Sequence, residues 1–418
     1  MFRALVLLAL LPGPTRQDPE PFPDPGSKKG LQVQMVEDAL HLGVRHATFN
    51  VQLGHLWTRT PREGDHPTTR GGETFHFRAD AVADLDTRIG AMSDAGAVVY
   101  LILLARATGD AERDEVVLHP DADEAMPHRL AALNVGTERG RRFLRAAVGF
   151  LAERYGSVEP GRPRVWGWIV GNEVNSHWWW HNLGRAGLER VAREYERAVR
   201  LVREEVGAHQ PAARVYISLE HHWQQRFAAG DADQSLPGRA LLDRFVAIAR
   251  EGGDYPWHVA FHPYPENLFD PRVWEDESAL PSADSPRITF KNLEVLTDYL
   301  QREELTHEGL PRRVICSEQG FHAAEGPAGA RDQAAGFAWS WRKVAGLAGV
   351  DALILHRHVD HSAEFGLNLG LWTREPDSVA TPAAKRPIHE LFRLCGTEGG
   401  AAAVDAALEA VGAPSPGG

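Results

Sequence analysis

Two glutamates in this sequence have the residue type and the position to do acid–base or nucleophilic chemistry. Glu173 comes just after the apolar run 165–170, and Glu318 comes just after the apolar run 313–316. Two carboxyl groups that flank one bond can hydrolyse a glycoside, because one protonates the leaving oxygen while the other attacks the anomeric carbon or activates water. Two carboxylates that both follow strand-like runs therefore form a more specific signal than a single carboxylate in a loop.

Polar side chains follow other apolar runs as well. Asn172 directly precedes Glu173, and His262 and Tyr264 stand at the end of another such run. We expect four further residues at or after the ends of these runs to contact substrate: Asn50, His222, His356 and His358. Their amide, imidazole and phenol groups can donate and accept hydrogen bonds, as the recognition of sugar hydroxyls requires.

The two histidines of His356-x-His358 leave three interpretations open. Their spacing puts both rings on one face of a strand, and imidazoles so placed can bind substrate, form a structural network at a rim or hold a metal ion. A metal-dependent hydrolase centred on these two residues is thus an alternative function. The glycosidase chemistry of the two glutamates needs neither a metal nor another cofactor.

Tryptophan is unusually frequent, with 12 residues against 7 tyrosines, and it clusters at 178–180. Indole rings stack on sugar faces, so we expect Trp178 and Trp372 to contact substrate. Trp57 and Trp223, which also follow expected strands, would contribute to the same wall. The alternative for the cluster is a hydrophobic plug that closes the top of the fold.

Short apolar runs, often β-branched, alternate along the chain with segments of helical spacing. The expected strands are 31–33, 44–51, 97–104, 165–170, 214–219, 258–261, 313–316 and 352–355. The expected helices are 34–42, 81–95, 138–155, 188–206, 239–250, 290–304, 332–347 and 388–393. Strict alternation calls for parallel strands with helical crossovers, and these eight units predict an α/β fold, the (β/α)₈ TIM barrel.

In such a barrel the functional side chains lie at the C-terminal ends of the strands. Glu173 follows the fourth expected strand and Glu318 the seventh, so both carboxyl groups can face one opening. A doubly wound open sheet is the rival architecture. No G-x-G-x-x-G motif follows an early strand, so nucleotide binding gains no support.

These strand ends resemble those of clan A of the glycoside hydrolases, which are retaining enzymes on a (β/α)₈ barrel. Three segments carry the resemblance: Gly171-Asn172-Glu173, His262-Pro263-Tyr264 and Cys316-Ser317-Glu318. The resemblance implies that Glu173 is the acid/base, that Glu318 is the nucleophile and that the carboxyl groups lie about 5–5.5 Å apart. It further implies that Asn172 contacts the sugar 2-hydroxyl, that Tyr264 hydrogen-bonds the nucleophile and that His262 lines the subsite.

The sequence also departs from the clan. Val174 stands where many members have proline, and the usual tryptophan of the eighth strand is not evident. Arg45 lies at the start of its strand, so the arginine that often supports the nucleophile is not assigned to it. These departures indicate a divergent member.

Composition excludes several other classes of protein. The formal net charge is −12, which argues against a nucleic-acid binder and favours a neutral sugar over a polyanion as the partner. The 2 cysteines are too few for a disulfide scaffold or a structural zinc site. A carbohydrate-binding pseudoenzyme remains an alternative, although the presence of both glutamates disfavours it.

The ends of the chain predict its organisation. Arg3 followed by the apolar run 4–11 is typical of a secretory signal, so we expect a signal peptide at 1–16, a proline-rich linker at 17–29, the catalytic domain at 30–396 and a C-terminal tail at 397–418. A frayed apolar N-terminus is the alternative. No apolar run is long enough to span a membrane. The signal peptide leads us to expect a secreted or periplasmic protein. We also expect a monomer whose partner is a carbohydrate substrate.

Overall fold

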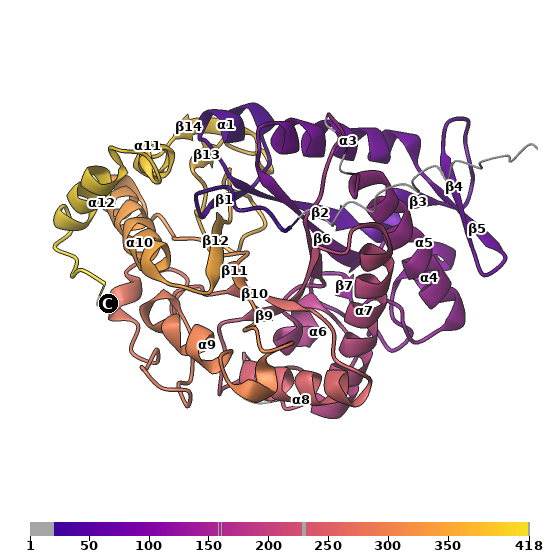
Figure 1. Ribbon diagram of the computed structural model, residues 1–418. Helices are drawn as coiled ribbons and strands as arrows, with labels where there is room; N and C mark the ends of the chain where they lie inside the picture. The colour runs from indigo at the N-terminus through magenta and orange to yellow at the C-terminus, as the bar shows by residue number, and fades with distance from the viewer. Residues whose placement is uncertain (1–20, 158, 160, 228–230, 417–418) are drawn as a thin grey trace, which may run out of the picture.

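The computed structural model describes residues 21–157, 159, 161–227 and 231–416, so the expected signal peptide lies outside the described residues. Eight parallel strands close into a barrel, because β2 pairs with both β1 and β6 (Figure 1). The strands are β1 (Lys29–Gln32), β2 (His46–Gln52), β6 (Val98–Arg106), β8 (Gly167–Val170), β9 (Arg214–Glu220), β10 (His258–His262), β11 (Val314–Cys316) and β12 (Val350–Leu355). The predicted (β/α)₈ TIM barrel is confirmed.

Helices surround the barrel, as Figure 1 shows. They are α1 (Val36–His41), α3 (Ala79–Asp94), α5 (Glu138–Tyr155), α7 (Leu188–His209), α8 (Gly238–Glu251), α9 (Glu294–Tyr299), α10 (Gly326–Gly346) and α11 (Pro387–Leu394). Local sequence explains their bounds. The Thr137 hydroxyl accepts from the Gly140 amide and caps α5, which buries Phe143 and Leu144 on its barrel side.

Residues inserted after β2 form a separate small sheet on the flank. Helix α2 (Leu53–Leu56) leads into β3 (Trp57–Thr58), β4 (His66–Arg70) and β5 (Glu73–Phe77), which pair antiparallel. The sheet packs on α5, where the Trp57 ring lies 5.2 Å from that of Phe143, centroid to centroid. Trp57 is therefore a core residue, and its expected place in a substrate wall is wrong.

Side-chain alternation decides which strand residues point into the barrel. On β6, Tyr100 and Ile102 belong to the cluster that fills the barrel, whereas Leu101 and Leu103 pack outward against helices. By the same alternation, several strands carry an inward-facing polar side chain at or near their C-terminal ends. These side chains are Gln32, Asn50, Glu220, His262 and His356. They lie at the mouth, by which we mean the C-terminal ends of the eight barrel strands together with the loops that follow them.

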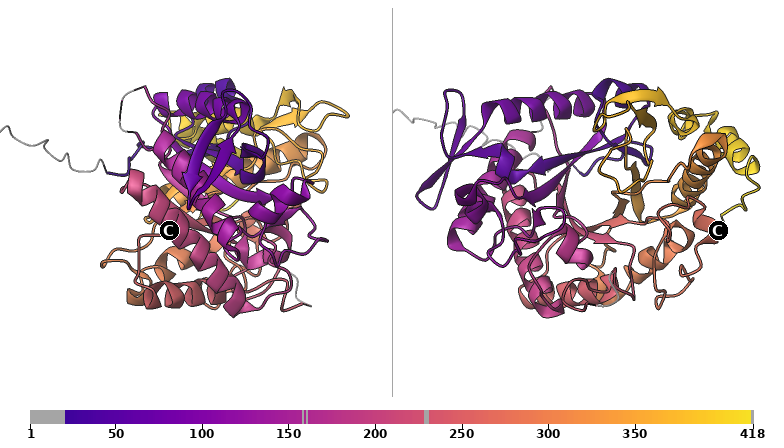
Figure 2. Two further views of the ribbon diagram at one scale, coloured as in Figure 1. Left: turned by 90° about the vertical axis from the view of Figure 1, so that its right-hand side faces the viewer. Right: turned by 180° about the vertical axis from the view of Figure 1, so that it is seen from behind.

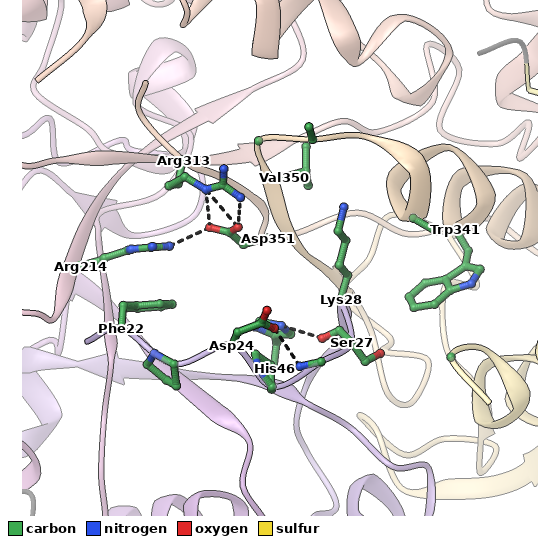
Figure 3. A pocket seen from close by; sticks show the side chains of 17 residues that line it. Phe22, Asp24, Ser27, Lys28, His46, Arg214, Arg313, Trp341, Val350 and Asp351 are labelled. Carbon is green, nitrogen blue, oxygen red and sulfur yellow. Dashed lines mark hydrogen bonds and ion pairs between the residues drawn. The ribbon is translucent and has the colours of Figure 1, made fainter. Parts of the chain in front are cut away.

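Part of the expected linker covers the opposite end of the barrel. The Phe22 ring lies 5.9 Å from that of Trp166 and 3.8 Å from the Arg214 guanidinium. A cavity of about 540 Å³ lies there, and Figure 3 shows Asp351 between the guanidinium groups of Arg214 and Arg313. Charge pairing at this end joins the starts of β9 and β12 through an Arg214–Asp351 contact of 2.7 Å.

We expect Asp351→Ala to destabilise the protein by about 2 kcal/mol, because it leaves two part-buried guanidinium groups without their shared carboxylate. Chemical denaturation of the full chain measures this change. Asp405→Ala is the matched control, since Asp405 pairs with Arg342 at the surface and should contribute less than about 0.5 kcal/mol. Equal stability of the two variants would contradict the structural role of Asp351.

The C-terminal residues pack on the barrel. Helix α12 (Gly400–Glu409) buries Val404 and Leu408 and lies next to α10, as the view from behind in Figure 2 also shows. The expected tail 397–418 thus includes a docked helix of 10 residues. Within the described residues, no helix combines the length and the apolar character needed to cross a membrane.

Candidate active site

The two predicted carboxyl groups meet at the mouth. Glu173 follows β8 and is buried, and Glu318 follows β11 and is half-buried. One oxygen of each and one ring nitrogen of His262 all lie within 4.8 Å of one another. The nearest carboxyl oxygens are thus close enough to act on the two sides of one glycosidic bond, as the two carboxyl groups of glycosidases do.

An unusual backbone conformation holds Glu173 in place. Its φ of 41° and ψ of 53° are left-handed, which is uncommon for a residue with a side chain. The Glu173 amide donates to the Ser218 hydroxyl at 3.0 Å, which ties the strained residue to β9. Gly171 precedes it at a φ of 71°, where a Cβ would lie 2.5 Å from Nδ1 of His181. Glycine is thus required there to bring Glu173 into the barrel mouth.

Burial and charge set the protonation of Glu173. Burial in the first place, with the neighbouring carboxylates of Glu318 and Glu220, raises the pKa of Glu173 to about 6. Nδ1 of His262 lies 2.8 Å from Oε1 of Glu173 and opposes this rise. Burial also disfavours the charged form of His262, but the Glu318 and Glu173 carboxylates outweigh it and raise the His262 pKa. Glu173 can therefore hold a proton in weakly acidic solution.

Tyr264 orients the second carboxyl group. Its hydroxyl donates to Oε1 of Glu318 at 3.2 Å. Burial, together with the negative charge of Glu318, places the Tyr264 pKa well above its usual value. The phenol therefore keeps its proton and remains a donor to the Glu318 carboxylate. This contact is the one that the resemblance implied.

Glu220 is a third carboxylate at the mouth that the sequence analysis did not assign to the site. It accepts from Asn175 Nδ2 at 2.6 Å, from the Ser176 hydroxyl at 2.8 Å and from His222. Burial disfavours its charge, but His222 and the other donors lower the Glu220 pKa to about 2. Its place at the end of β9, in phase with the inward-facing Tyr216, is the signal that could have found it.

The expected substrate contact of His222 is corrected by this network. His222 is buried, and its Nδ1 lies 2.6 Å from Oε2 of Glu220. Glu220, His221 and His222 are also close enough to hold a metal ion. Nδ1 of His221 pairs instead with the Tyr264 carbonyl at 3.0 Å. Nε2 of His222 lies 3.5 Å from Nη2 of Arg287, so both ring nitrogens of His222 have partners and it serves this network rather than facing substrate.

His356 and His358 do not act together. Nδ1 of His356 hydrogen-bonds Gln32 at the mouth. Both nitrogens of His358 are occupied, because Nε2 contacts Asp38 at 2.9 Å and Nδ1 accepts from the Gln34 amide at 3.3 Å. The expected role of His358 in binding substrate or a metal is wrong, and the paired-histidine metal site loses its basis. His356 stays a predicted substrate contact.

Trp372 belongs to the same structural network. Its Nε1 donates to Asp38 at 2.9 Å, the Lys385 ammonium lies 5.0 Å from the centre of its ring, and the His389 and Trp372 rings meet edge to face. The indole is half-buried, and its stacking on a sugar stays a prediction. Its hydrogen-bond partner Asp38 lies on α1, more than 300 positions away, a contact that spacing along the sequence does not reveal.

The loop after β12 adds a carboxylate that carried no sequence signal. Glu364 lies 3.6 Å from Nε2 of His356 and 3.1 Å from Nη2 of Arg357. Burial raises its pKa, but His356 and Arg357 outweigh burial and lower the Glu364 pKa to about 2. Its negative charge also contributes to the raised pKa of Tyr264, the residue that hydrogen-bonds Glu318.

The tryptophans that were expected near substrate lie in different environments. Trp180 stacks on His128 at 3.9 Å between ring centroids and packs against the cluster that fills the barrel. Trp178 lies 5.4 Å from the Arg185 guanidinium, and its contact with substrate stays a prediction. Trp223 is fully buried and donates to a backbone carbonyl, so it forms no substrate wall.

Two predicted amides remain available at the mouth. Asn172 is half-buried beside Glu173. Asn50 is exposed, and its Oδ1 lies 3.4 Å from Nε2 of Gln32. Their contacts with substrate stay predictions.

Solved structures with the same fold are glycoside hydrolases. A family 39 glycoside hydrolase from Bacteroides cellulosilyticus WH2 aligns with a TM-score of 0.58 at 13% identity over 90% of this chain and 65% of that one. A β-glucosidase from Pyrococcus furiosus aligns with a TM-score of 0.55 at 15% identity over 90% of this chain and 86% of that one. A glucosidase from Croceicoccus marinus aligns with a TM-score of 0.55 at 13% identity over 90% and 69%. These proteins therefore share the (β/α)₈ barrel fold of this chain.

Sequence comparison identifies a family, but the description of that family assigns it no activity. Residues 21–416 match the model of a family described as "Family of unknown function (DUF5722)". No curated protein matches the sequence.

Proposed function

We propose that this chain, which belongs to the DUF5722 family of unknown function, is a retaining glycoside hydrolase that cleaves O-glycosidic bonds of an oligo- or polysaccharide. One observation carries the proposal: carboxyl oxygens of Glu173 and Glu318 lie within 4.8 Å of each other at the mouth of the barrel. That spacing suits attack by one carboxylate on the sugar whose leaving oxygen the other protonates.

The reaction has two steps. The Glu318 carboxylate attacks the anomeric carbon while Glu173 gives its proton to the leaving oxygen, so the glycosidic bond breaks and a glycosyl ester of Glu318 forms. Glu173, now ionised, takes a proton from a water molecule that attacks the same carbon, and Glu318 leaves as a carboxylate. Two displacements at one carbon give overall retention of configuration.

The pKa of Glu173 gives the expected pH dependence. The first step needs the protonated form, and Glu173 loses its proton as the pH rises through about 6. We therefore expect kcat/KM to fall about tenfold per pH unit on the alkaline side of that value. Steady-state rates with an aryl glycoside between pH 4 and pH 9 or so measure the profile. A rate that keeps rising beyond pH 8 or so would contradict an acid role for Glu173.

Tyr264→Phe removes the phenol that donates to Glu318 and keeps the ring. A hydrogen bond to a charged group is worth about 1.5–3 kcal/mol, so we expect kcat/KM to fall by about 10- to 150-fold. Tyr299→Phe is the matched control, because the Tyr299 hydroxyl contacts Asp243 on the outer helices. Comparable losses in the two variants would mean that the phenol of Tyr264 has no specific part in the reaction.

A screen of aryl glycosides and polysaccharides, with the Glu318→Ala variant as the blank, tests the proposal as a whole. We expect hydrolysis of at least one substrate by the wild-type chain and none by the blank. Binding of the same sugars without hydrolysis would instead favour the carbohydrate-binding pseudoenzyme.

A further inference from the structure

Three aromatic rings from the loops of distant strands contact one another. His128 lies in the segment that leads from β6 to β7 (Leu130–Ala131). Trp180 ends the short helix α6 (His177–Trp180), which follows β8, and Phe365 lies in the loop after β12. The His128 and Trp180 rings stack with their centroids 3.9 Å apart, and the Phe365 ring meets the His128 ring edge to face at 5.5 Å. We refer to these three side chains as the aromatic bridge.

The strand order shows that the aromatic bridge joins opposite sides of the barrel. Around the closed barrel the strands follow one another as β1, β2, β6, β8, β9, β10, β11 and β12. Strand β8 is therefore four places from β12 in either direction, and β6 is next to β8. A contact between the loop after β12 and the segments after β6 and β8 thus spans the width of the barrel.

Both ends of the aromatic bridge rest on the barrel itself. At one end, Trp180 packs against the cluster of side chains that fills the barrel. At the other end, Glu364 is the neighbour of Phe365 in the chain and lies 3.6 Å from Nε2 of His356, whose side chain faces the mouth. Glu364 also pairs with Arg357 at 3.1 Å. The bridge therefore crosses the mouth and does not run outside the rim.

The backbone holds the two contacting loops in uncommon conformations. Phe365 has a φ of 55°, and Arg129, which follows His128, has a φ of 58°. A bulky residue stays in the left-handed region only where its surroundings hold it there, and such residues cluster at functional sites. Nη2 of Arg129 donates to the Ala107 carbonyl at 3.1 Å, which ties this turn to the end of β6. The loops on both sides of the Phe365–His128 contact are thus fixed.

Burial does not explain the position of Phe365. The residue remains 67% exposed, so its contact with His128 removes little of its surface from water. An aromatic side chain that stays exposed in a fixed position is typical of a surface that meets a ligand. At the mouth of this barrel that ligand is the proposed sugar substrate.

The aromatic bridge divides the mouth into two sides. Strands β1 and β2 end on one side, and β9, β10 and β11 end on the other. Glu318 follows β11, and Tyr264, its hydrogen-bond partner, follows β10. Glu173 follows β8, at the foot of the bridge, and its carboxyl group points to His262 of β10. The two carboxyl groups therefore lie beside the bridge, on the side of β9–β11.

We propose that the aromatic bridge restricts the candidate active site to the ends of glycan chains, so that the enzyme releases terminal sugars and does not cut inside a polysaccharide. Cleavage within a chain needs the chain to continue on both sides of the bond, and the bridge bars the way from the β9–β11 side to the β1–β2 side. The inference rests on the proposed glycosidase function and narrows its substrate class to chain ends and short oligosaccharides. Phe365 and His128 are then specificity-determining residues.

Viscometry combined with an assay of new reducing ends tests the proposal. The probes are soluble β-glucan, xylan, mannan, galactan and arabinan, each with its own short oligosaccharides. We expect the wild-type chain to produce reducing ends with little loss of viscosity and to release mono- or disaccharides first. Turnover of oligosaccharides or aryl glycosides without attack on any polysaccharide also supports the restriction to chain ends. A rapid loss of viscosity while few bonds are cleaved overturns it.

Two substitutions assign the restriction to the aromatic bridge. We expect the loss of viscosity per bond cleaved to rise at least about tenfold in Phe365→Ala and in His128→Ala, because a chain can then lie across the mouth. His128→Phe keeps a stacking ring and should retain the wild-type ratio. Leu310→Ala is the matched control, since Leu310 is 71% exposed but precedes β11, at the end of the barrel opposite the mouth. An unchanged ratio in both alanine variants of the bridge overturns the assignment.

The outcomes separate this inference from the proposed function. Cleavage inside polysaccharides by the wild-type chain refutes the role of the aromatic bridge and leaves the glycosidase function intact. Absence of hydrolysis of every glycan and every aryl glycoside refutes the proposed function, and the inference falls with it.

Discussion

Glu318→Ala is expected to lower kcat by at least about 10⁴-fold on any glycoside that the wild-type chain hydrolyses. The substitution removes the carboxylate that forms the covalent bond, and water cannot take its place at the same distance from the anomeric carbon. Glu173 remains in the variant but has no intermediate to release. Initial rates with the best aryl glycoside from the substrate screen measure the loss.

Azide distinguishes a lost nucleophile from a damaged fold. In Glu318→Ala the anion fits the space that the carboxylate leaves, attacks the anomeric carbon and gives a glycosyl azide of inverted configuration. Glu325→Ala is the matched control, because Glu325 follows the same strand but is exposed. Full activity of Glu318→Ala, or an equal loss in Glu325→Ala, would contradict the nucleophile assignment.

Glu173→Ala is expected to cost about 10²- to 10⁴-fold on substrates with poor leaving groups, which need a proton as the bond breaks. The cost should be much smaller for a dinitrophenyl glycoside, whose leaving group needs no proton. Hydrolysis of the glycosyl-enzyme then limits the overall rate, because no base activates water. Azide should restore turnover and give a glycosyl azide of retained configuration.

The pH profile provides a second readout for Glu173→Ala. With the dinitrophenyl substrate, the decline in rate above about pH 6 should disappear, because the group that titrates there is absent. Asp276→Ala is a matched control: burial also raises the Asp276 pKa to about 6, but this carboxyl group lies in the loop after β10. Persistence of the decline in Glu173→Ala would assign it to another group.

The fold was predictable because each βα unit carries its own signal. Helix α5, for example, spans the expected residues 138–155 because Thr137 caps its start and the apolar spacing continues to Tyr155. The small sheet β3–β5 was not predicted. Its strands are short and interrupted by turn residues, and they are stabilised by packing on α5 rather than by their own pattern.

The meeting of Glu173 and Glu318 at the mouth was predictable because both glutamates follow apolar strands whose direction a parallel barrel fixes. The hydrogen bond from Tyr264 to Glu318 also agrees with the resemblance. The partners of His358 and Trp372 were not predictable, because Asp38 meets them only when the first and last units of the barrel close. Glu364 lies in an irregular loop, where no periodicity shows which way a side chain points.

Covalent labelling tests the central claim most directly. A 2-deoxy-2-fluoro dinitrophenyl glycoside of the preferred sugar should inactivate the wild-type chain, because the fluorine slows release of the glycosyl-enzyme more than its formation. Peptide mass spectrometry is then expected to place the sugar on Glu318. An adduct on another residue, or no adduct although the matching unfluorinated glycoside is hydrolysed, would contradict the double-displacement mechanism.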